Sequence, residues 1–313
     1  DDAILKNIID VTNWMNINDI DTLLASFILY IWPDAYKNSY LNSKISYNKF
    51  YTGKFKKINL NYYYKNKATN CGFGYTDNLP NLYHGIVKKS LFEKHKVITG
   101  KYLDSTSFDV YNAFIISKYT KNFVLLDYPI TIRGISGNSN ANRIVLNRSK
   151  EHFIEFKNIK IPDIFPYELN SEISIAESTY IALFDTGQFE LIKNLNIAIV
   201  YGKISANNLI SSLKYFLKYV SLNKSKISFF IYFSFFLKKR ILDYCKNLMS
   251  KSLNKLLPFV LNKISNKRQI KCINIELAIS DINDYLFNKN INIDFDNLYN
   301  EKKEMKEIWD FLN

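Results

Sequence analysis

Hydrophobic residues in the first half of the chain change between the spacing of helices and that of strands. From residue 3 onward, apolar positions that include Ile4 and Ile8 follow a helical spacing, which predicts a helix. The sequence DTLLASFILYIWPD at 21–34 is apolar almost throughout. It predicts a buried strand that ends at Pro33, because proline has no N–H group to donate to a sheet. The sequence KINLNYYYK at 57–65 predicts another strand.

The same alternation continues to residue 148. It predicts five further elements: a short strand leading into a helix at 83–95, a helix at 107–119, and a pair of strands at 122–134. Ser107 or Asp109 can accept hydrogen bonds from the free backbone N–H groups at the start of the second of these helices. Pro129 separates the two strands, and GISGNSNANR at 134–143 has the composition of a loop. Strands that alternate with helices predict an α/β domain over residues 1–148.

A different pattern follows residue 148. The segment 149–170 contains the proline-punctuated sequence FKNIKIPDIFPYEL and is predicted to be a linker. Helix-length apolar patterns dominate from Ser171 onward, at 171–185, 206–220, 226–249 and 296–313. The sequence therefore predicts a mostly α-helical extension over residues 171–313.

The positive charge of the chain is concentrated in that extension. Residues 201–271 hold fifteen of the 42 Lys and Arg residues but only one of the 29 acidic residues, so this basic segment accounts for all of the net charge of +13. Such a segment predicts contact with an anionic surface, either a membrane or nucleic acid. Nucleic acid is the weaker expectation, because the segment is poor in Arg and carries no recognition motif.

Aromatic residues gather at the centre of the basic segment. Phe and Tyr surround the helical pattern of residues 227–237, with basic residues on both sides. This helix could lie in a membrane interface, with its rings among the headgroups and its cations on anionic lipid. The alternative is a buried helix of a bundle, with solvated lysines at its ends. The apolar run is about half as long as the roughly 20 residues that a membrane span needs.

The cysteine and histidine content limits the chemistry. Cys71, Cys245 and Cys272 form no CxxC pair, and the chain has only three histidines. An odd set of distant cysteines predicts a reducing, cytoplasmic compartment. The charge of the basic segment adds the expectation of peripheral contact with the inner face of a membrane. A zinc site built on imidazole is not expected.

Three short motifs follow one another in the first half of the chain: YHGIVKKSLFEK, then FDVYNAF, then FVLLDYPITIRGISGNSN. In this order, over roughly residues 1–142, they resemble the second half of a family 2 glycosyltransferase with the GT-A fold. The resemblance implies the C-terminal part of a GT-A mixed sheet that begins at the family's Asp-rich motif, here DDA. It also implies transfer of a sugar from a nucleotide-diphosphate donor to a hydroxyl of a glycan or lipid-linked acceptor, with inversion, in cell-surface polysaccharide or glycan synthesis.

The same resemblance gives the two opening acids a metal role. It implies a divalent metal, Mg²⁺ or Mn²⁺, because these hard cations prefer oxygen ligands and can bridge carboxylates to a diphosphate. The metal would neutralise charge on the leaving nucleoside diphosphate. Asp2 is then the direct ligand, and Asp1 lies nearer the ribose or an outer-shell water. Without the resemblance, Asp1 and Asp2 would be expected to cap a helix.

Asp109 occupies the family position of the catalytic base. An inverting transfer needs a carboxylate that takes the proton from the attacking acceptor hydroxyl. The family more often has Glu-Asp where this chain has Phe108–Asp109, which leaves Asp104 as a reserve candidate. Taken alone, an Asp at this position would be a first-turn acid of a helix.

The loop after the last strand offers donors for phosphate, or it is an ordinary surface loop. The residues predicted to contact the donor phosphates are Arg133, Gly134, Ser136 and Gly137. His84 is a candidate for the acceptor side, although a satisfied, partly buried histidine is the simpler expectation. Trp32 could stack on a sugar or fill the core, and the core is favoured.

The missing methionine at residue 1 predicts that the chain begins inside a longer protein. In a complete GT-A domain, the strands that bind the nucleotide base precede the Asp-rich motif. We therefore expect the 313-residue chain not to turn over a donor, and its full-length parent to do so. The alternative function is a non-catalytic module that docks a glycan-assembly complex to an anionic membrane or a partner through residues 201–271.

Overall fold

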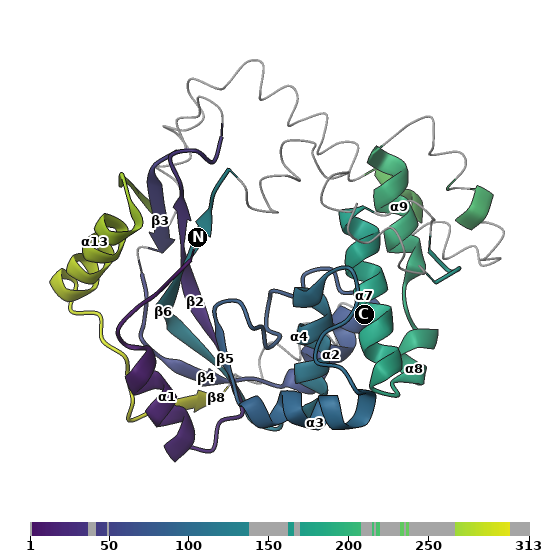
Figure 1. The fold of residues 1–313 in the computed structure, drawn as a ribbon, viewed down its shortest axis with the longest axis horizontal. Helices are drawn as coiled ribbons and strands as arrows, with labels where there is room; N and C mark the ends of the chain where they lie inside the picture. Colours follow the sequence, from purple (N-terminus) through teal and green to yellow (C-terminus); the bar gives the residue numbers. More distant parts are fainter. Residues whose placement is uncertain are drawn as a thin grey trace.

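The computed structural model describes residues 2–36, 42–48, 50–137, 162–165, 170–207 and 267–300, and a few positions between 215 and 237. Within these residues, one sheet lies between two groups of helices (Figure 1). The strands are β1 (Ala3–Ile4), β2 (Thr22–Ile31), β3 (Lys44–Asn48), β4 (Phe55–Lys57), β5 (Gly85–Val87), β6 (Phe123–Ile135), β7 (Lys267–Lys271) and β8 (Leu298–Asn300). The helices are α1 (Ile8–Ile17), α2 (Leu60–Thr69), α3 (Lys89–Thr99), α4 (Phe108–Tyr119), α7 (Ser171–Asp185), α8 (Phe189–Lys193), α9 (Ile197–Asn207) and α13 (Ile275–Asn288).

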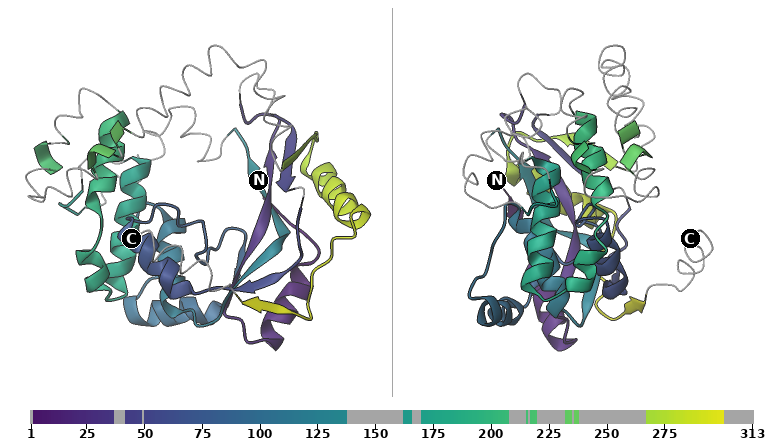
Figure 2. Two further views of the ribbon diagram at one scale, coloured as in Figure 1. Left: turned by 180° about the vertical axis from the view of Figure 1, so that it is seen from behind. Right: turned by 90° about the vertical axis from the view of Figure 1, so that its right-hand side faces the viewer.

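The sheet is mixed and curled (Figure 2). Six strands follow the order β7-β3-β2-β6-β4-β8, while β1 pairs with β6 and β5 pairs with β2. The two long central strands, β2 and β6, run parallel, and β4 runs parallel to β8. The other pairs are antiparallel. The predicted α/β class and mixed sheet are confirmed.

Two hydrophobic cores lie on opposite faces of the central strands. One core packs α1 and α13 against the sheet, with Trp14 and Ile282 among its buried residues. The other packs α2, α4, α7 and α9, with Phe114 and Leu183 among its buried residues. Elements on both sides of the predicted 149–170 linker therefore share each core, because α7 and α13 follow that linker in the sequence.

An irregularity at the centre of the sheet changes which residues of β2 face the α1 and α13 core. The pairing of β2 with β6 shifts register on both sides of Ser26. Before the shift, Leu23 and Ala25 lie in that core, and after it Ile28 and Tyr30 do. Side chains of a regular strand alternate between faces, so this exchange of parity turns Phe27 to the opposite face. Phe27 is accordingly exposed.

Three predicted elements need correction. The predicted strand at 57–65 is instead the end of β4 and the start of α2, because Asn59 caps that helix by accepting from Tyr62 N and because Leu60 and Tyr64 are buried one turn apart. The predicted strand pair at 122–134 is the single strand β6, which continues past Pro129. The predicted first helix begins at Ile8, after β1. The strand at 21–34, the short strand leading into a helix at 83–95, and the helices at 107–119 and 171–185 are confirmed.

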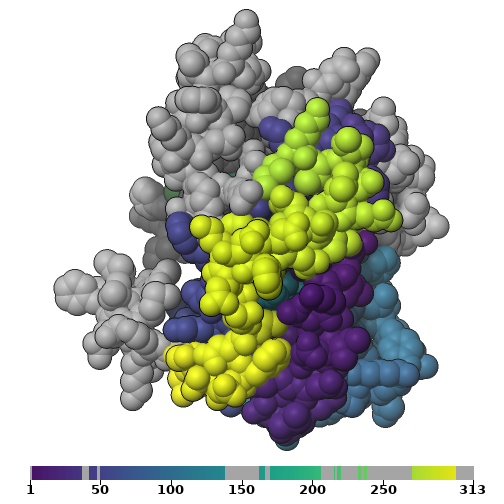
Figure 3. All heavy atoms as spheres, turned by 90° about the vertical axis from the view of Figure 1, so that its left-hand side faces the viewer, coloured from purple at the N-terminus to yellow at the C-terminus, as the bar shows by residue number. Residues whose placement is uncertain are grey.

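The second half of the chain is not helical throughout. β7 and β8 add strands to the sheet, and β8 occupies the start of the helix predicted at 296–313. Figure 3 shows α13 and the residues after it lying beside α1 on one face of the molecule. Most of the patterns at 206–220 and 226–249, and most of the linker, lie outside the described residues. In the part of the chain that the structure describes, no helix has both the length and the apolar character that crossing a membrane requires.

Candidate active site

Residues from three separate motifs meet on one face of the sheet. The strand β1 lies beside β6, and Asp2, which precedes it, accepts a hydrogen bond on Oδ1 from the backbone N–H of Gly134 at 2.7 Å. Arg133 acts electrostatically on Asp109, in the first turn of α4. Asp109 raises the pKa of the Tyr83 hydroxyl, with smaller contributions from burial and from Asp2. Asp2, Asp109 and Arg133 thus all lie near enough to Tyr83 to act on its pKa.

Phe27 forms the aromatic centre of this face. Its ring is 43% exposed, and the centroid of the His84 ring stacks 4.6 Å from it. The Arg133 guanidinium lies over the same ring, 5.9 Å from its centroid. The register shift at Ser26 is what brings Phe27 to this side, so the site depends on an irregularity of the sheet.

His84 is held in a neutral state beside Phe27. Its backbone has a φ of 64°, in the left-handed region, and its Nδ1 lies 2.8 Å from Thr131 Oγ1. Burial, together with the nearby Arg133, lowers its pKa to about 4, while Asp2 opposes the shift. The ring is therefore uncharged near neutral pH and can only exchange neutral hydrogen bonds. Its burial agrees with the simpler expectation, but its Nε2 atom is buried and has no hydrogen-bond partner among the described residues, so the ring is not fully satisfied.

The Asp109 carboxyl group binds protons more tightly than an ordinary aspartate. Burial raises its pKa, whereas its own backbone N–H, Arg133 and the Tyr75 hydroxyl act in the opposite direction. Ser107 occupies the cap position of α4 but makes no side-chain capping bond, so Asp109 is the acid that faces the free N–H groups of the first turn. A carboxylate at a helix N-terminus is held in a fixed direction, which suits a group that must accept a proton at one point.

The sequence did not single out Phe27, Tyr75 or Tyr83. The two tyrosines come from the connection between α2 and β5, where Cys71, Gly72 and Gly74 all have positive φ values. A glycine-rich stretch between two predicted elements was the available signal, since such stretches form the connections that carry functional side chains. The hydrophobic pattern did not indicate that Phe27 would face away from the core.

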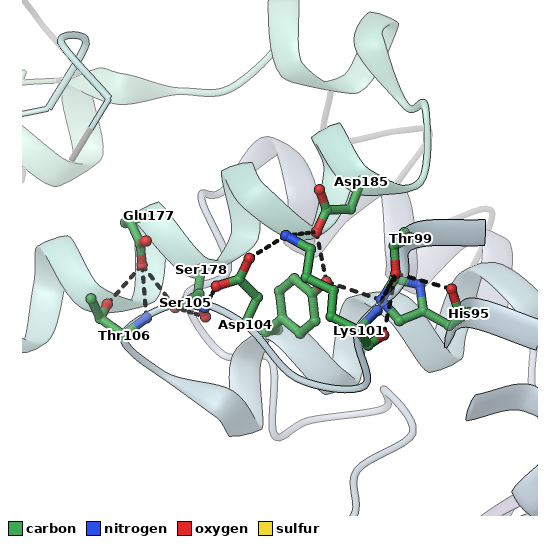
Figure 4. Close-up of polar contacts among 10 residues, drawn as sticks. His95, Thr99, Lys101, Asp104, Ser105, Thr106, Glu177, Ser178 and Asp185 are labelled. Carbon is green, nitrogen blue, oxygen red and sulfur yellow. Dashed lines mark hydrogen bonds and ion pairs between the residues drawn. The ribbon is translucent and has the colours of Figure 1, made fainter. Parts of the chain in front are cut away.

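Asp104 belongs to a different set of contacts. It forms an ion pair with Lys101, and its Oδ1 accepts from Ser105 N at 2.7 Å. Although burial opposes the change, these two partners lower its pKa. Figure 4 shows its carboxylate among groups that face α7. Asp104 thus has a structural partner, and Asp109 remains the better candidate for the base.

The predicted phosphate loop is described only in part. Gly134 donates its N–H to Asp2, and a Cβ atom on Gly137 would lie 2.8 Å from the backbone oxygen of Asp34. Ser136 is buried. Trp32 is partly buried against the core that contains α1 and meets Tyr30 edge to face at 5.3 Å, as the core alternative expects. Asp1 and the loop beyond residue 137 lie outside the described residues.

Asp2 is the candidate metal ligand that the structure describes. Among the described residues, no group of three or more His, Cys, Asp or Glu side chains could hold a metal ion. Mg²⁺ commonly binds through one or two carboxylates together with water and substrate phosphates. The exposed Asp2 carboxylate could bind a metal ion together with water and substrate phosphates. A site made of protein ligands alone would need further carboxylates near Asp2.

Comparisons of the chain with models of known protein families, with curated proteins and with solved structures found no match.

Proposed function

We propose that this chain carries the acceptor-side part of a metal-dependent glycosyltransferase, which moves a sugar from a nucleotide-diphosphate donor to an acceptor hydroxyl with inversion. The observation that carries the proposal is that Asp2 accepts from Gly134 N, next to Arg133, while Asp2, Asp109 and Arg133 all act electrostatically on Tyr83. Asp2 comes from DDA, Asp109 from FDVYNAF and Arg133 from FVLLDYPITIRGISGNSN, which are parts of the resemblance to family 2 glycosyltransferases. The setting would be the synthesis of a cell-surface polysaccharide or another glycan.

Each residue has a distinct role in this proposal. Asp109 takes the proton from the acceptor hydroxyl, and its raised pKa favours a base that works near neutral pH. Asp2 shares a divalent metal with the donor phosphates, and Arg133 offers a planar set of donors to the same phosphates. The exposed rings of Phe27 and Tyr83 supply an apolar face for the acceptor sugar.

Nucleotide release by the 313-residue chain, and by any longer form of the protein, tests the proposal. Nucleotide sugars would be screened with Mn²⁺, and nucleotide binding would be followed by calorimetry. We expect Asp109→Asn to reduce release by about 10²–10⁴-fold, the range typical of a lost general base. Asp2→Asn should weaken metal-dependent nucleotide binding.

Two carboxylates provide matched controls. Asp104→Asn changes the reserve candidate, which pairs with Lys101, and Asp10→Asn changes an exposed acid of α1. Both variants should retain release. Release that survives Asp109→Asn, or a protein that binds no nucleotide with metal present, would contradict the glycosyltransferase proposal.

The charge of residues 201–271 supports a second candidate, a module that docks to an anionic membrane. Sedimentation with phosphatidylcholine vesicles, with and without phosphatidylserine, distinguishes the two functions. Binding that requires phosphatidylserine, in a protein that binds no nucleotide, would favour docking. Binding to neither kind of vesicle would remove this candidate.

A further inference from the structure

A cluster of buried polar side chains joins α7 to the turn that precedes α4. Figure 4 shows Glu177 and Ser178 of α7 facing Ser105 and Thr106 of that turn. The Oε2 atom of Glu177 accepts from the backbone N–H of Thr106 at 3.2 Å and from its hydroxyl at 2.7 Å. Glu177 has no exposed surface. A fully buried carboxylate is rare in proteins, and it is tolerated only where hydrogen bonds compensate for lost hydration.

Packing alone does not explain a carboxylate at position 177. Its second oxygen, Oε1, is buried and has no hydrogen-bond partner among the described residues. Burial raises the pKa of the carboxyl group, while the hydrogen bonds from Thr106 and Ser178 oppose that change. An apolar side chain of similar size at such a position often stabilises a protein as well or better. The polar contacts therefore suggest a role in geometry and not only in stability.

The contacts reach Ser107, the residue just before α4. Ser178 Oγ accepts from the backbone N–H of Ser107 and from the Ser105 hydroxyl, both at 2.9 Å, and it donates to Glu177 Oε2 at 3.2 Å. Ser107 is the cap residue of α4, and Asp109 follows two positions later. Asp109 lies in the first turn of α4, so contacts that hold the cap also hold the backbone from which the Asp109 side chain projects.

The turn needs this support because its backbone is unfavourable. Ser105 has a φ of 77°, in the left-handed region that side chains other than glycine adopt at a cost. The other end of the segment is also tied to α7, since Lys101 lies 3.2 Å from Asp185. Tyr111 of α4 donates to the same carboxylate at 2.7 Å. α7 thus holds the segment from Lys101 to Ser107 at both ends.

We propose that Glu177 is a positioning residue: through Thr106 and Ser178 it holds the turn before α4 so that the Asp109 carboxylate faces Arg133 and Tyr75. The positioning is a property of the chain itself, and its importance for catalysis rests on the proposed glycosyltransferase function. On this view α7 is part of the support of the site, although it lies in the predicted extension.

Hydrogen exchange in the 313-residue chain tests the proposal without any substrate. Glu177→Leu removes both acceptors, and Glu177→Gln keeps an acceptor for Thr106. Glu190→Gln, on the exposed surface of α8, is the matched control for loss of charge. We expect Glu177→Leu to speed exchange at residues 105–109 by about tenfold or more, with the rest of α4 and α7 unchanged. Glu177→Gln should restore much of the protection, and Glu190→Gln should change nothing.

The pKa of Asp109 is the second readout, because a role limited to stability would not move it. It can be measured by carboxyl carbon NMR, with Asp109→Asn identifying the signal. A change in Glu177→Leu that Glu177→Gln reverses would support positioning. Unchanged exchange at residues 105–109 together with an unchanged Asp109 pKa would overturn it, and so would faster exchange spread evenly over α4 and α7. These outcomes do not depend on whether the protein turns over a donor, so failure of the proposed function would be seen separately.

Discussion

Gly53 permits an unusually close contact between two backbone segments, and its replacement by alanine should be costly. The residues after α13 cross the sheet at Gly53, where Asp294 N donates to Gly53 O at 2.9 Å. Gly53 has a φ of +70°, and a Cβ atom there would lie 1.8 Å from the backbone oxygen of Asn292. Because the obstacle is backbone, no side chain can rotate out of the way. Gly53→Ala must therefore displace the crossing segment, residues 289–297.

The expected loss of stability has two parts. A left-handed backbone costs an alanine about 1 kcal/mol relative to glycine. Displacing the segment also breaks the Asp294 N–Gly53 O bond and the bond from Trp14 Nε1 to Phe295 O, which is 2.9 Å long. Each hydrogen bond contributes about 1 kcal/mol, and Phe295 also loses its packing on Phe55, 5.8 Å away. We expect Gly53→Ala to lower the free energy of unfolding by about 3–4 kcal/mol.

Gly100→Ala is the matched control. Gly100 ends α3 with a φ of +78°, and a Cβ atom there would meet nothing within 4 Å. It carries only the backbone cost, so we expect a loss of about 1 kcal/mol. Urea unfolding followed by far-ultraviolet circular dichroism would measure both variants. Losses that agree within about 0.5 kcal/mol would refute the steric argument, because the close approach to Asn292 would then cost nothing.

Two further predictions concern pH. Because the pKa of His84 is lowered to about 4, its stabilising contribution should be complete above the ordinary value of 6.5 and should be lost as pH falls through 4. NMR titration of the ring should give that midpoint, and a midpoint near 6.5 would contradict the buried neutral state. For Glu177 the sign is opposite, since its pKa is raised from 4.5, so its contribution should be greatest below that value and should fall as pH rises. The urea concentration at the midpoint of unfolding should therefore fall more between about pH 4 and 8 in the parent chain than in Glu177→Gln. Equal pH dependence of the two midpoints would refute this prediction.

The hydrophobic pattern predicted elements that are rich in apolar residues and buried along much of their length. The strand at 21–34 and the helix at 107–119 are of this kind, and both are present. The error at 57–65 has a local cause, because alternation within KINLNYYYK resembles a strand while the cap at Asn59 starts a helix. The paired strands of residues 267–300 depend on distant partners, which a local pattern cannot identify.

The charged residues of the candidate site could be predicted from their sequence motifs. The residue whose position depends on an irregularity of the sheet could not. Asp2, Asp109 and Arg133 could be chosen by their motifs, and the structure brings them together. Phe27 could not, since a regular strand would have placed it on the same face as Leu23 and Ala25, in the core. The register shift that exposes it arises from the pairing of two strands a hundred residues apart.

The support from α7 illustrates a further limit of pattern reading. In this helix Ser174, Glu177 and Ser178 recur at intervals of three and four residues, which is the spacing that normally marks the solvent face. All three are nevertheless buried, because their partners are the polar groups of the turn before α4. Periodicity shows that these residues share a face, but it does not show what lies opposite. A stripe of polar residues on a helix can therefore mark a buried polar contact as well as a solvent-exposed face. In this protein, the buried contact lies beside the proposed catalytic base.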